Sequence, residues 1–217
     1  MPTKGIDVSS HNGIIDPYRV AAAGYRFAYI RATHHVIDDG VYIECAPDAM
    51  FARNWREFRE AGMVVGAYHY LASKYRDQAI DSPLDAQIYE FCAQLPSDPV
   101  APGILPPMLD VEAGDPDPDD VLRFLDAIEE RTGLCPWIYT MIGWWDTSRL
   151  KDDERFLRFP LVAGDWTPPL DLPGKWPDCI IWQTSSTGRV PGINGNVDID
   201  EMQADESMFR LLASLDS

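Results

Sequence analysis

The sequence predicts an α/β fold: a closed, TIM-like (β/α)5(β)3 barrel with an incomplete outer ring of helices. Two observations favour it. Short apolar segments alternate with amphipathic ones as far as Met141, which is typical of parallel strands separated by helices. Beyond that point three strand-like segments follow with only short or irregular links. No linker or low-complexity segment interrupts the chain, so residues 1–217 are expected to form one domain.

Five strand-and-helix units are expected first. The strands are predicted at 5–9, 26–33, 63–71, 108–112 and 136–141. Asp-Pro pairs predict helix starts at Asp16 and Asp117, with Asp as the N-cap and Pro at the first helical position, and these helices end at Gly24 and Gly133. An amphipathic helix is expected over 47–61, and another begins at Ser82 with Asp85 completing a capping box.

The last third of the chain predicts strands at 160–166, 179–186 and 196–200, followed by a helix over 205–215. In a closed barrel the first and last strands are neighbours. Residues 5–9 and 196–200 are therefore expected to lie side by side.

Charge and hydropathy exclude several classes of partner. The 35 acidic and 18 basic residues give a net charge of -17, which argues against binding nucleic acid or anionic membranes. No apolar run reaches the ~18 residues of a membrane-spanning helix. The N-terminal segment has no apolar core typical of a signal peptide. We expect a monomer made in the cytoplasm that reaches its substrate by release or by another export route.

The cysteines do not form a metal-binding motif. Cys45, Cys92, Cys135 and Cys179 are far apart and include no Cys-x-x-Cys pair. Small buried thiols are favoured over disulfides, because no signal peptide is evident.

Two carboxylates follow the apolar run of the fourth predicted strand. Residues i and i+2 of a strand point to the same face, so Asp110 and Glu112 project together and Val111 points away. The carboxyl ends of barrel strands are where active sites are built. A single Asp-x-Glu is weak evidence, because exposed strand ends often carry acids.

Further acids recur at comparable positions. Asp7 ends the first strand, and Asp198 and Asp200 lie on the last one, so closure brings Asp7 and Asp198 toward the same mouth. Crowded carboxylates keep a proton on at least one member near neutral pH, as a general acid requires. An ionised partner can stabilise the cationic transition state of glycosidic bond cleavage. Asp200 is also compatible with a loop or cap role.

Aromatic residues gather at the same strand ends, where they can stack on the apolar faces of sugar rings. Tyr68, Tyr139 and Trp166 are the expected substrate-binding residues, although core packing is the alternative for any one of them. His69 points away from its tyrosine neighbours and is expected to be structural. His34 and His35, with Asp38 and Asp39, match no common metal spacing and are expected in a solvated loop.

The motifs in combination resemble one known family. GIDVSSHNG, AYIRAT, GAYHY, MLDVE, PWIYT and WQTSSTGRVPGINGNVDID occur in the order found in the family 25 glycoside hydrolases, the lysozymes also called N-acetylmuramidases. The resemblance covers nearly the whole chain and implies hydrolysis of the β-1,4 bond between N-acetylmuramic acid and N-acetylglucosamine in peptidoglycan glycan strands. It implies Glu112 as proton donor, Asp110 as its partner, Asp7 and Asp198 as further acids, and no metal or organic cofactor.

The sequence departs from the family pattern in three places. Arg31-Ala32-Thr33-His34-His35 replaces Lys-Ala-Thr-Glu-Gly, Thr184 replaces a common Tyr, and Val197-Asp198-Ile199-Asp200 replaces Val-Asp-Leu-Asn, which makes Asp200 an extra acid. Two alternatives stay open: a non-catalytic glycan-binding barrel, and a glycosidase for another N-acetylated glycan such as chitin. A phage endolysin and a bacterial enzyme fit equally well.

Overall fold

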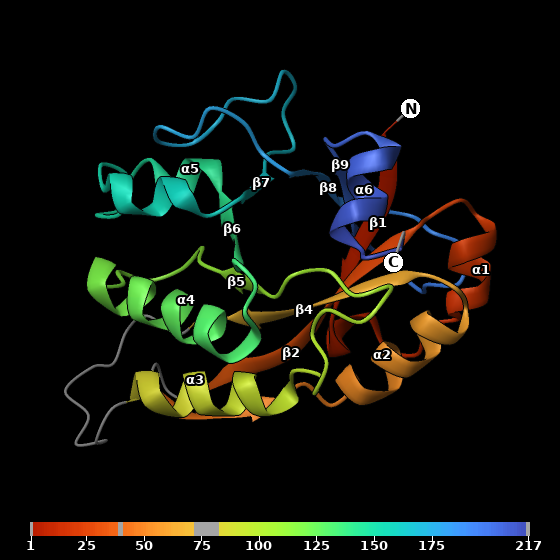
Figure 1. The fold of residues 1–217 in the computed structure, drawn as a ribbon, viewed down its shortest axis with the longest axis horizontal. Helices are drawn as coiled ribbons and strands as arrows, with labels where there is room; N and C mark the ends of the chain where they lie inside the picture. Colours follow the sequence, from red (N-terminus) through yellow and green to blue (C-terminus); the bar gives the residue numbers. More distant parts are fainter. Residues whose placement is uncertain (1, 39–40, 72–82, 216–217) are drawn as a thin grey trace.

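The computed structural model describes residues 2–38, 41–71 and 83–215. Nine strands form one sheet in the order β1-β9-β8-β7-β6-β5-β4-β2-β3, and pairing of β1 with β2 closes eight of them into a barrel (Figure 1). The elements are β1 (Thr3–Val8), η1 (Ser10–Asn12), α1 (Pro17–Ala22), β2 (Phe27–Asp38), β3 (Val41–Pro47), α2 (Phe51–Glu60), β4 (Val64–Tyr70), α3 (Pro83–Gln94), β5 (Met108–Asp110), α4 (Pro118–Thr132), β6 (Trp137–Met141), α5 (Ile142–Trp145), η2 (Glu154–Arg158), β7 (Leu161–Gly164), β8 (Ile181–Gly188), β9 (Val197–Met202) and α6 (Glu206–Leu212).

The predicted barrel and its incomplete helical ring are confirmed. From β1 through β2 and β4 to β8 each neighbouring pair is parallel, whereas β9 runs antiparallel to both β8 and β1. A short link joins β8 to β9, and a parallel return would need a longer crossover. In Figure 1, α2, α3 and α4 lie along one side of the barrel. The ring of Phe209 in α6 lies 6.2 Å from that of Phe27 in β2.

The segment after the second predicted strand was predicted wrongly. His34 and His35, expected in a loop, lie within β2, which continues to Asp38 and pairs antiparallel with β3. The helix expected from Pro47 begins only at Phe51. Asp39-Gly40 between β-branched and aromatic residues is a hairpin signal in the sequence. Asp39 and Ser82, the expected start of the third helix, lie outside the described residues.

The predicted Asp-Pro helix starts are confirmed. Asp16 caps α1 by accepting a hydrogen bond from the backbone N–H of Arg19, and Asp117 caps α4 in the same way from Asp119. Gly133 ends α4 with φ +70°, a left-handed conformation that favours glycine.

Strand alternation sorts the side chains into two cores. Outward-facing residues such as Ile30, Leu109 and Ile138 pack beneath the helices. Inward-facing residues fill the barrel, and Phe209 of α6 joins them at its base. Gly66 makes room for this packing, because a Cβ there would lie 2.3 Å from the ring of Tyr29. Apolar side chains therefore fill the lower barrel.

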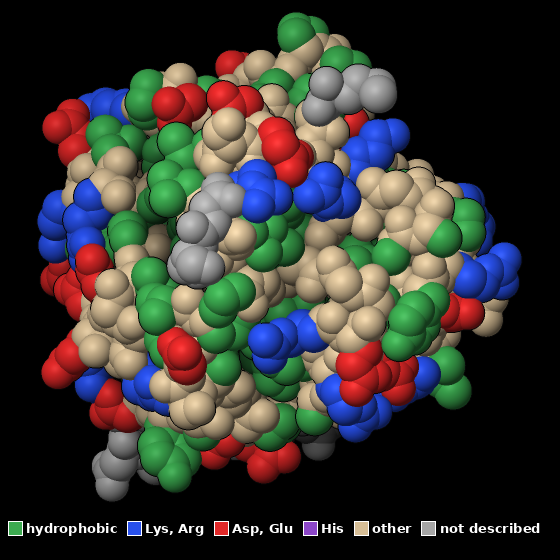
Figure 2. Space-filling model, turned by 45° about the vertical axis from the view of Figure 1, so that its right-hand side comes forward, with side chains coloured by type: hydrophobic (Ala, Val, Ile, Leu, Met, Phe, Trp, Pro, Cys, Tyr) green, Lys and Arg blue, Asp and Glu red, His purple; other side chains and the backbone are tan. Residues whose placement is uncertain are grey.

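The remaining expectations concern thiols, membranes and surface charge. All four cysteines are free, as predicted, although only Cys179 is buried. Within the described ranges, no helix is long and apolar enough to cross a bilayer. Figure 2 shows one face of the molecule, on which Asp and Glu lie among Lys and Arg. On that face the negative charge is not gathered into a single patch.

Candidate active site

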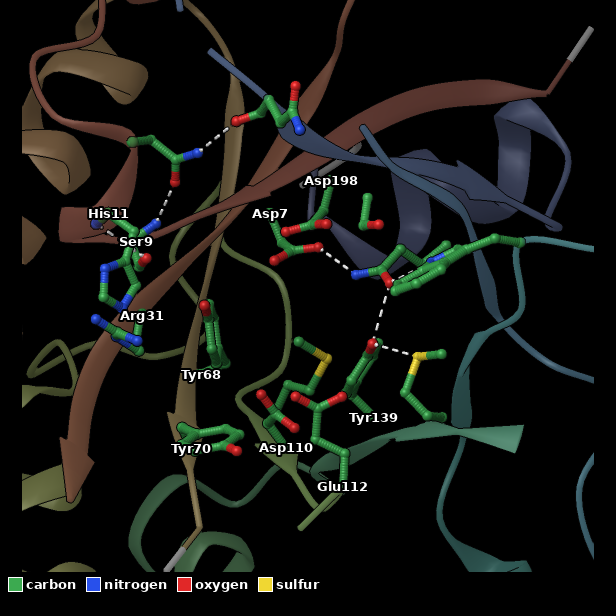
Figure 3. A pocket seen from close by; sticks show the side chains of 17 residues that line it. Asp7, Ser9, His11, Arg31, Tyr68, Tyr70, Asp110, Glu112, Tyr139 and Asp198 are labelled. Atoms are coloured by element: carbon green, nitrogen blue, oxygen red, sulfur yellow. Dashed lines mark hydrogen bonds between the residues drawn. The ribbon is translucent and has the colours of Figure 1, made fainter. Parts of the chain in front are cut away.

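A cleft of about 580 Å³ opens where the parallel strands end. Figure 3 shows side chains from both sides of the barrel pointing into it. The residues that line it are Asp7, Ser9, His11, Asn12, Arg31, Tyr68, Tyr70, Met108, Asp110, Glu112, Tyr139, Met141, Trp166, Gln183, Ser186, Asn196 and Asp198. All four predicted acids and all three chosen aromatic residues are among them, so the structure brings together seven of the eight expected site residues.

Asp110 and Glu112 lie on one wall of the cleft. Asp110 ends β5, and the backbone N–H of Val111 continues the ladder by donating to the carbonyl of Tyr139 at 2.9 Å. Val111 points into the outer core, as its position between the two acids predicts. Asp110 is only 7% exposed and its Oδ1 has no partner among the described residues, whereas Glu112 is half-buried. The pair thus offers one buried carboxyl and one that reaches the cleft.

Asp7 and Asp198 form the opposite wall. They are directly paired residues of the antiparallel strands β1 and β9, so barrel closure places their side chains side by side (Figure 3). Asp7 also accepts a hydrogen bond from Gln183 Nε2 at 2.7 Å.

Burial and mutual repulsion raise the pKa values of these acids. For Asp110, burial and the charge of Glu112 hold the pKa well above its ordinary value, although Arg31 opposes the shift. Burial also raises the pKa of Glu112; a hydrogen bond with Tyr139 opposes this and Asp198 adds to it. Burial raises the pKa of Asp198. Burial also raises the pKa of Asp7, and the negative charges of Asp200 and Asp198 raise it further. The cluster therefore holds its protons to higher pH than isolated carboxyls do, and a proton near the cleft is what general acid catalysis needs.

Asp200 does not line the cleft, contrary to its expected role in binding substrate. It is 2% exposed, lies on the inner side of β9 below Asp198, and its Oδ1 has no partner within the described part of the chain. Burial and the charge of Asp198 hold its pKa well above its ordinary value. Because a buried carboxylate without a cation or donor is costly, burial favours the protonated form of Asp200 beneath the cleft.

The three aromatic residues differ in exposure. Trp166 is 48% exposed at the rim of the cleft, whereas Tyr68 and Tyr139 are 8% and 7% exposed and also pack in the barrel core. Trp166 therefore has a free face for a sugar ring, and the tyrosines present edges and hydroxyls from the cleft floor.

Two functional features were missed in the sequence. Gln183 is buried inside the barrel and bonds Asp7, Tyr139 and Trp166. Its alternation with Ile181 on an inward-facing strand was the signal available. Arg31 lines the cleft and forms a buried ion pair with Asp48 at 2.8 Å. No local pattern links those two residues.

Arg31 and two backbone N–H groups stabilise Asp48 in its ionised form. Burial pushes the pKa of Asp48 upward, but hydrogen bonds from the backbone N–H groups of Ser10 and Met50 and from Arg31 outweigh burial, so its pKa is lowered. Arg31 also donates to Ser10 Oγ at 3.2 Å. A fixed positive charge therefore lies beside the acid cluster.

Among the described histidines, His11 alone lines the cleft. His69 is fully buried on the outer side of β4, in keeping with its expected structural role. Within the described residues, no group of three or more His, Cys, Asp and Glu side chains could hold a metal ion.

The chain is similar to known lysozymes and muramidases. Lysozyme M1 of Streptomyces globisporus is 30% identical over 225 residues, spanning 97% of this chain and 70% of that protein. The N,O-diacetylmuramidase of Arthroderma benhamiae is 25% identical over 214 residues, spanning 90% of this chain and 83% of that one. The crystal structure of a bacterial lysozyme from Streptomyces coelicolor superposes with a TM-score of 0.81 and 28% identity, covering 100% and 99% of the two chains.

A family model extends this similarity to most of the sequence. The model described as glycosyl hydrolases family 25 matches residues 6–193, a range that contains Asp7, Asp110 and Glu112. Together with the relatives and the barrel, this match shows that the chain belongs to family 25 of the glycosyl hydrolases and is a glycoside hydrolase.

Proposed function

We propose that this glycoside hydrolase is an N-acetylmuramidase that cleaves the β-1,4 bond between N-acetylmuramic acid and N-acetylglucosamine in peptidoglycan. The similarity to lysozyme M1 supports the substrate class. The observation that carries the chemistry is the pairing of half-buried Glu112 with buried Asp110, whose Oδ1 has no partner in the described structure.

Glu112 is the proposed general acid. It lines the cleft, and burial favours its protonated form. In the first step it donates its proton to the glycosidic oxygen, which leaves as the hydroxyl of the departing sugar. In the second step the ionised Glu112 removes a proton from the attacking water.

Asp110 is the proposed partner that handles the 2-acetamido group. Its unpaired Oδ1 suits a donor brought by the substrate, and the acetamido N–H is such a donor. Accepting that hydrogen bond orients the acetamido oxygen toward the anomeric carbon, where it displaces the leaving group and forms a cyclic intermediate. Water then opens this intermediate with net retention of configuration. A covalent glycosyl-enzyme trapped on Asp110 would exclude this route in favour of direct carboxylate attack.

Asp7 and Asp198 are proposed to stabilise positive charge on the opposite side of the sugar. They face the acid pair across the cleft (Figure 3), and each ionised carboxylate there favours an oxocarbenium-like transition state. Trp166 at the rim provides the exposed aromatic face for an adjacent ring.

The decisive test is release of new reducing ends from purified peptidoglycan by the wild type and by Glu112→Gln. Muramic acid ends from the wild type, with the variant slower by ~10² or more, support the proposal. The matched control is Glu201→Gln, a partly exposed glutamate of β9 outside the cleft, which should retain full activity. New N-acetylglucosamine ends, activity on chitin alone, or binding without turnover would each overturn the muramidase assignment.

Access to the wall is a separate proposal. We propose that the enzyme is released from the cytoplasm through a membrane-disrupting partner or another export route. Cytoplasmic expression should leave cells intact until a membrane-permeabilising protein is induced, and lysis should then depend on Glu112. Lysis without that protein would contradict release as the limiting step.

A further inference from the structure

The amide of Gln183 occupies a central position between the two walls of the cleft. It is 4% exposed, its Nε2 donates to Asp7 Oδ2 at 2.7 Å, and its Oε1 accepts from Trp166 Nε1 at 3.1 Å. Oε1 also accepts from the hydroxyl of Tyr139 at 3.0 Å. One side chain therefore joins an acid of one wall, the tryptophan at the rim and the tyrosine beside Glu112 (Figure 3).

The hydroxyl of Tyr139 has more acceptors than protons. It donates to Gln183 Oε1 at 3.0 Å and lies 3.2 Å from Met141 Sδ. Glu112 lines the same cleft, and a hydrogen bond from Tyr139 would lower the pKa of that carboxyl. A phenol has one proton to donate and can accept as well. Tyr139 therefore donates to only one of these groups at a time.

The backbone of β7 leaves the space that this hydroxyl needs. Gly164 is paired with both Met141 and Gln183 in the sheet. A Cβ on Gly164 would lie 2.8 Å from the hydroxyl oxygen of Tyr139 and 2.5 Å from Met141 Sδ. Real Cβ atoms do not approach neighbours so closely, so a larger residue there would displace the tyrosine.

We propose that Gln183 is a positioning residue that holds the Tyr139 hydroxyl between itself and Glu112, and that this hydroxyl rotates toward Glu112 when Glu112 gives up its proton. The proposal rests on the role of Glu112 as general acid. No covalent bond changes in the rotation. With Glu112 protonated, Tyr139 donates to Gln183 and accepts from Glu112; with Glu112 ionised, Tyr139 donates to the carboxylate.

Removing the Gln183 acceptor and removing the Tyr139 hydroxyl should change the pKa of Glu112 in opposite directions. Without the Gln183 acceptor, the Tyr139 proton is free for Glu112 and stabilises its ionised form. Without the Tyr139 hydroxyl, ionised Glu112 loses a donor in a buried site and the protonated form gains. A purely structural role of Gln183 would not make its effect on Glu112 depend on the Tyr139 hydroxyl.

Other charged and titratable groups also face Glu112. They are Asp110 on its own segment, Asp198 on β9, Tyr70 on β4 and Tyr139 on β6, while Arg31 on β2 acts on Asp110. None of the carboxyls is altered in the test variants. Losing the Gln183 donor raises the pKa of Asp7. A less negative Asp7 acts in the same direction as the lost acceptor, because it reduces the negative potential in the cleft.

The experiment compares the pH dependence of kcat/KM on peptidoglycan for the wild type, Gln183→Met and Tyr139→Phe. The alkaline limb reports the loss of the Glu112 proton. It should move to lower pH in Gln183→Met and to higher pH in Tyr139→Phe, each by roughly half a unit or more. The double variant should lie close to Tyr139→Phe, because the acceptor has no effect once the hydroxyl is gone and only the contribution through Asp7 remains.

Matched controls carry the same substitutions elsewhere. Gln203→Met alters an exposed glutamine, and Tyr29→Phe removes a buried hydroxyl that donates to the carbonyl of Pro106 at 2.9 Å. Neither should move the limb. If Gln183→Met does not fold, Gln183→Asn serves instead, since its shorter amide withdraws the acceptor. A ¹³C titration of the Glu112 carboxyl follows the same shifts without turnover.

Shifts of the same sign in both variants, or none in either, would overturn the inference while leaving the muramidase assignment intact. Full activity of Glu112→Gln would instead remove the proposed function on which the inference rests. The two failures are therefore distinguishable in one set of proteins.

Discussion

Two buried polar side chains on neighbouring strands are accommodated in opposite ways. His69 on β4 faces the helices, where Thr33 Oγ1 lies 2.7 Å from its Nδ1 and Gln87 Oε1 lies 3.0 Å from its Nε2. Its ring stacks on Phe124 with centroids 4.9 Å apart. Asp110, at the end of β5, faces the barrel mouth with an oxygen that has no partner among the described residues.

The comparison separates a structural polar group from one that is proposed to act on the substrate. Both ring nitrogens of His69 are satisfied within the protein, and burial lowers its pKa to about 3, so it stays neutral. The site around Asp110 costs stability and is left for a ligand to complete. Buried polar groups with hydrogen-bond partners help to define a unique packing. A buried polar group without a partner in the protein can gain one when a ligand binds, which contributes to the binding free energy.

Changing Asp110 should separate activity from stability. Asp110→Asn keeps the shape but removes a carboxylate from a crowded, buried site. We expect activity to fall by about 100-fold or more, while the melting temperature stays the same or rises. Initial rates on peptidoglycan and a thermal melt measure both, with exposed Asp171→Asn as control. A large drop in melting temperature would assign Asp110 a structural role and break the contrast with His69.

Changing His69 should have the reverse effect. His69→Leu removes the hydrogen bonds that the ring makes with Thr33 and Gln87 in the outer core. We expect a loss of roughly 2–4 kcal/mol in the free energy of unfolding, with activity per folded molecule retained. Urea denaturation and rates at low temperature test this. The control His34→Leu alters a half-buried ring bonded to the carbonyl of His35 and should cost less.

Asp200→Asn tests a second buried acid through the pH dependence of the free energy of unfolding. Because the folded state raises the pKa of Asp200, it keeps a proton that the unfolded chain releases above about pH 4. This group therefore lowers stability as pH rises from about 4 toward neutrality. The variant should be about 1 kcal/mol or more stable than the wild type at pH 7 and equal to it at pH 4. A difference independent of pH would show that Asp200 does not carry the proton.

In the same denaturation experiments, His69 makes the free energy of unfolding depend on pH in the opposite direction. Its folded pKa of about 3 lies below the unfolded value of about 6.5, so stability falls as pH drops through that window. Both proteins share this contribution, and it cancels in their difference.

The smallest expected effect is that of ionic strength. The protein carries a net charge of -17, and wall polymers are often anionic. Added salt should raise the initial rate on whole cell walls by a few-fold between very low and physiological ionic strength. A short neutral glycan substrate serves as the control and should show no such rise. A rate that falls steadily from the lowest salt would contradict the idea.

Most of the fold was predictable because its signals are local. Asp16, Asp117 and Gly133 delimit helices through contacts within a few residues, and strand alternation alone placed Val111 in the outer core. The β2–β3 hairpin was missed because a run of polar residues, His34 and His35 among them, masked a strand pattern that pairing with β3 and β4 stabilises.

The candidate site was predictable only in part. Asp110 and Glu112 follow from one strand end, and their neighbours Asp7 and Asp198 follow once the barrel closes. The burial of Asp200 does not follow from its alternation, which is identical to that of Asp198. Asp198 and Asp200 differ in their depth inside the barrel, and that depth is set by the register of the paired strands.

Apart from the β2–β3 hairpin, the amino-acid sequence by itself determined the order of the main strands and helices, the inward and outward faces, the acid pair and the family of this hydrolase. The tertiary structure alone decided that Gln183 links Asp7 to Tyr139, that Arg31 pairs with Asp48, and that Asp200 lies beneath the cleft. The physical reason is range. Caps and alternation act over a few residues, whereas Asp7 and Gln183 meet across 176 positions of sequence only because the barrel closes in one register.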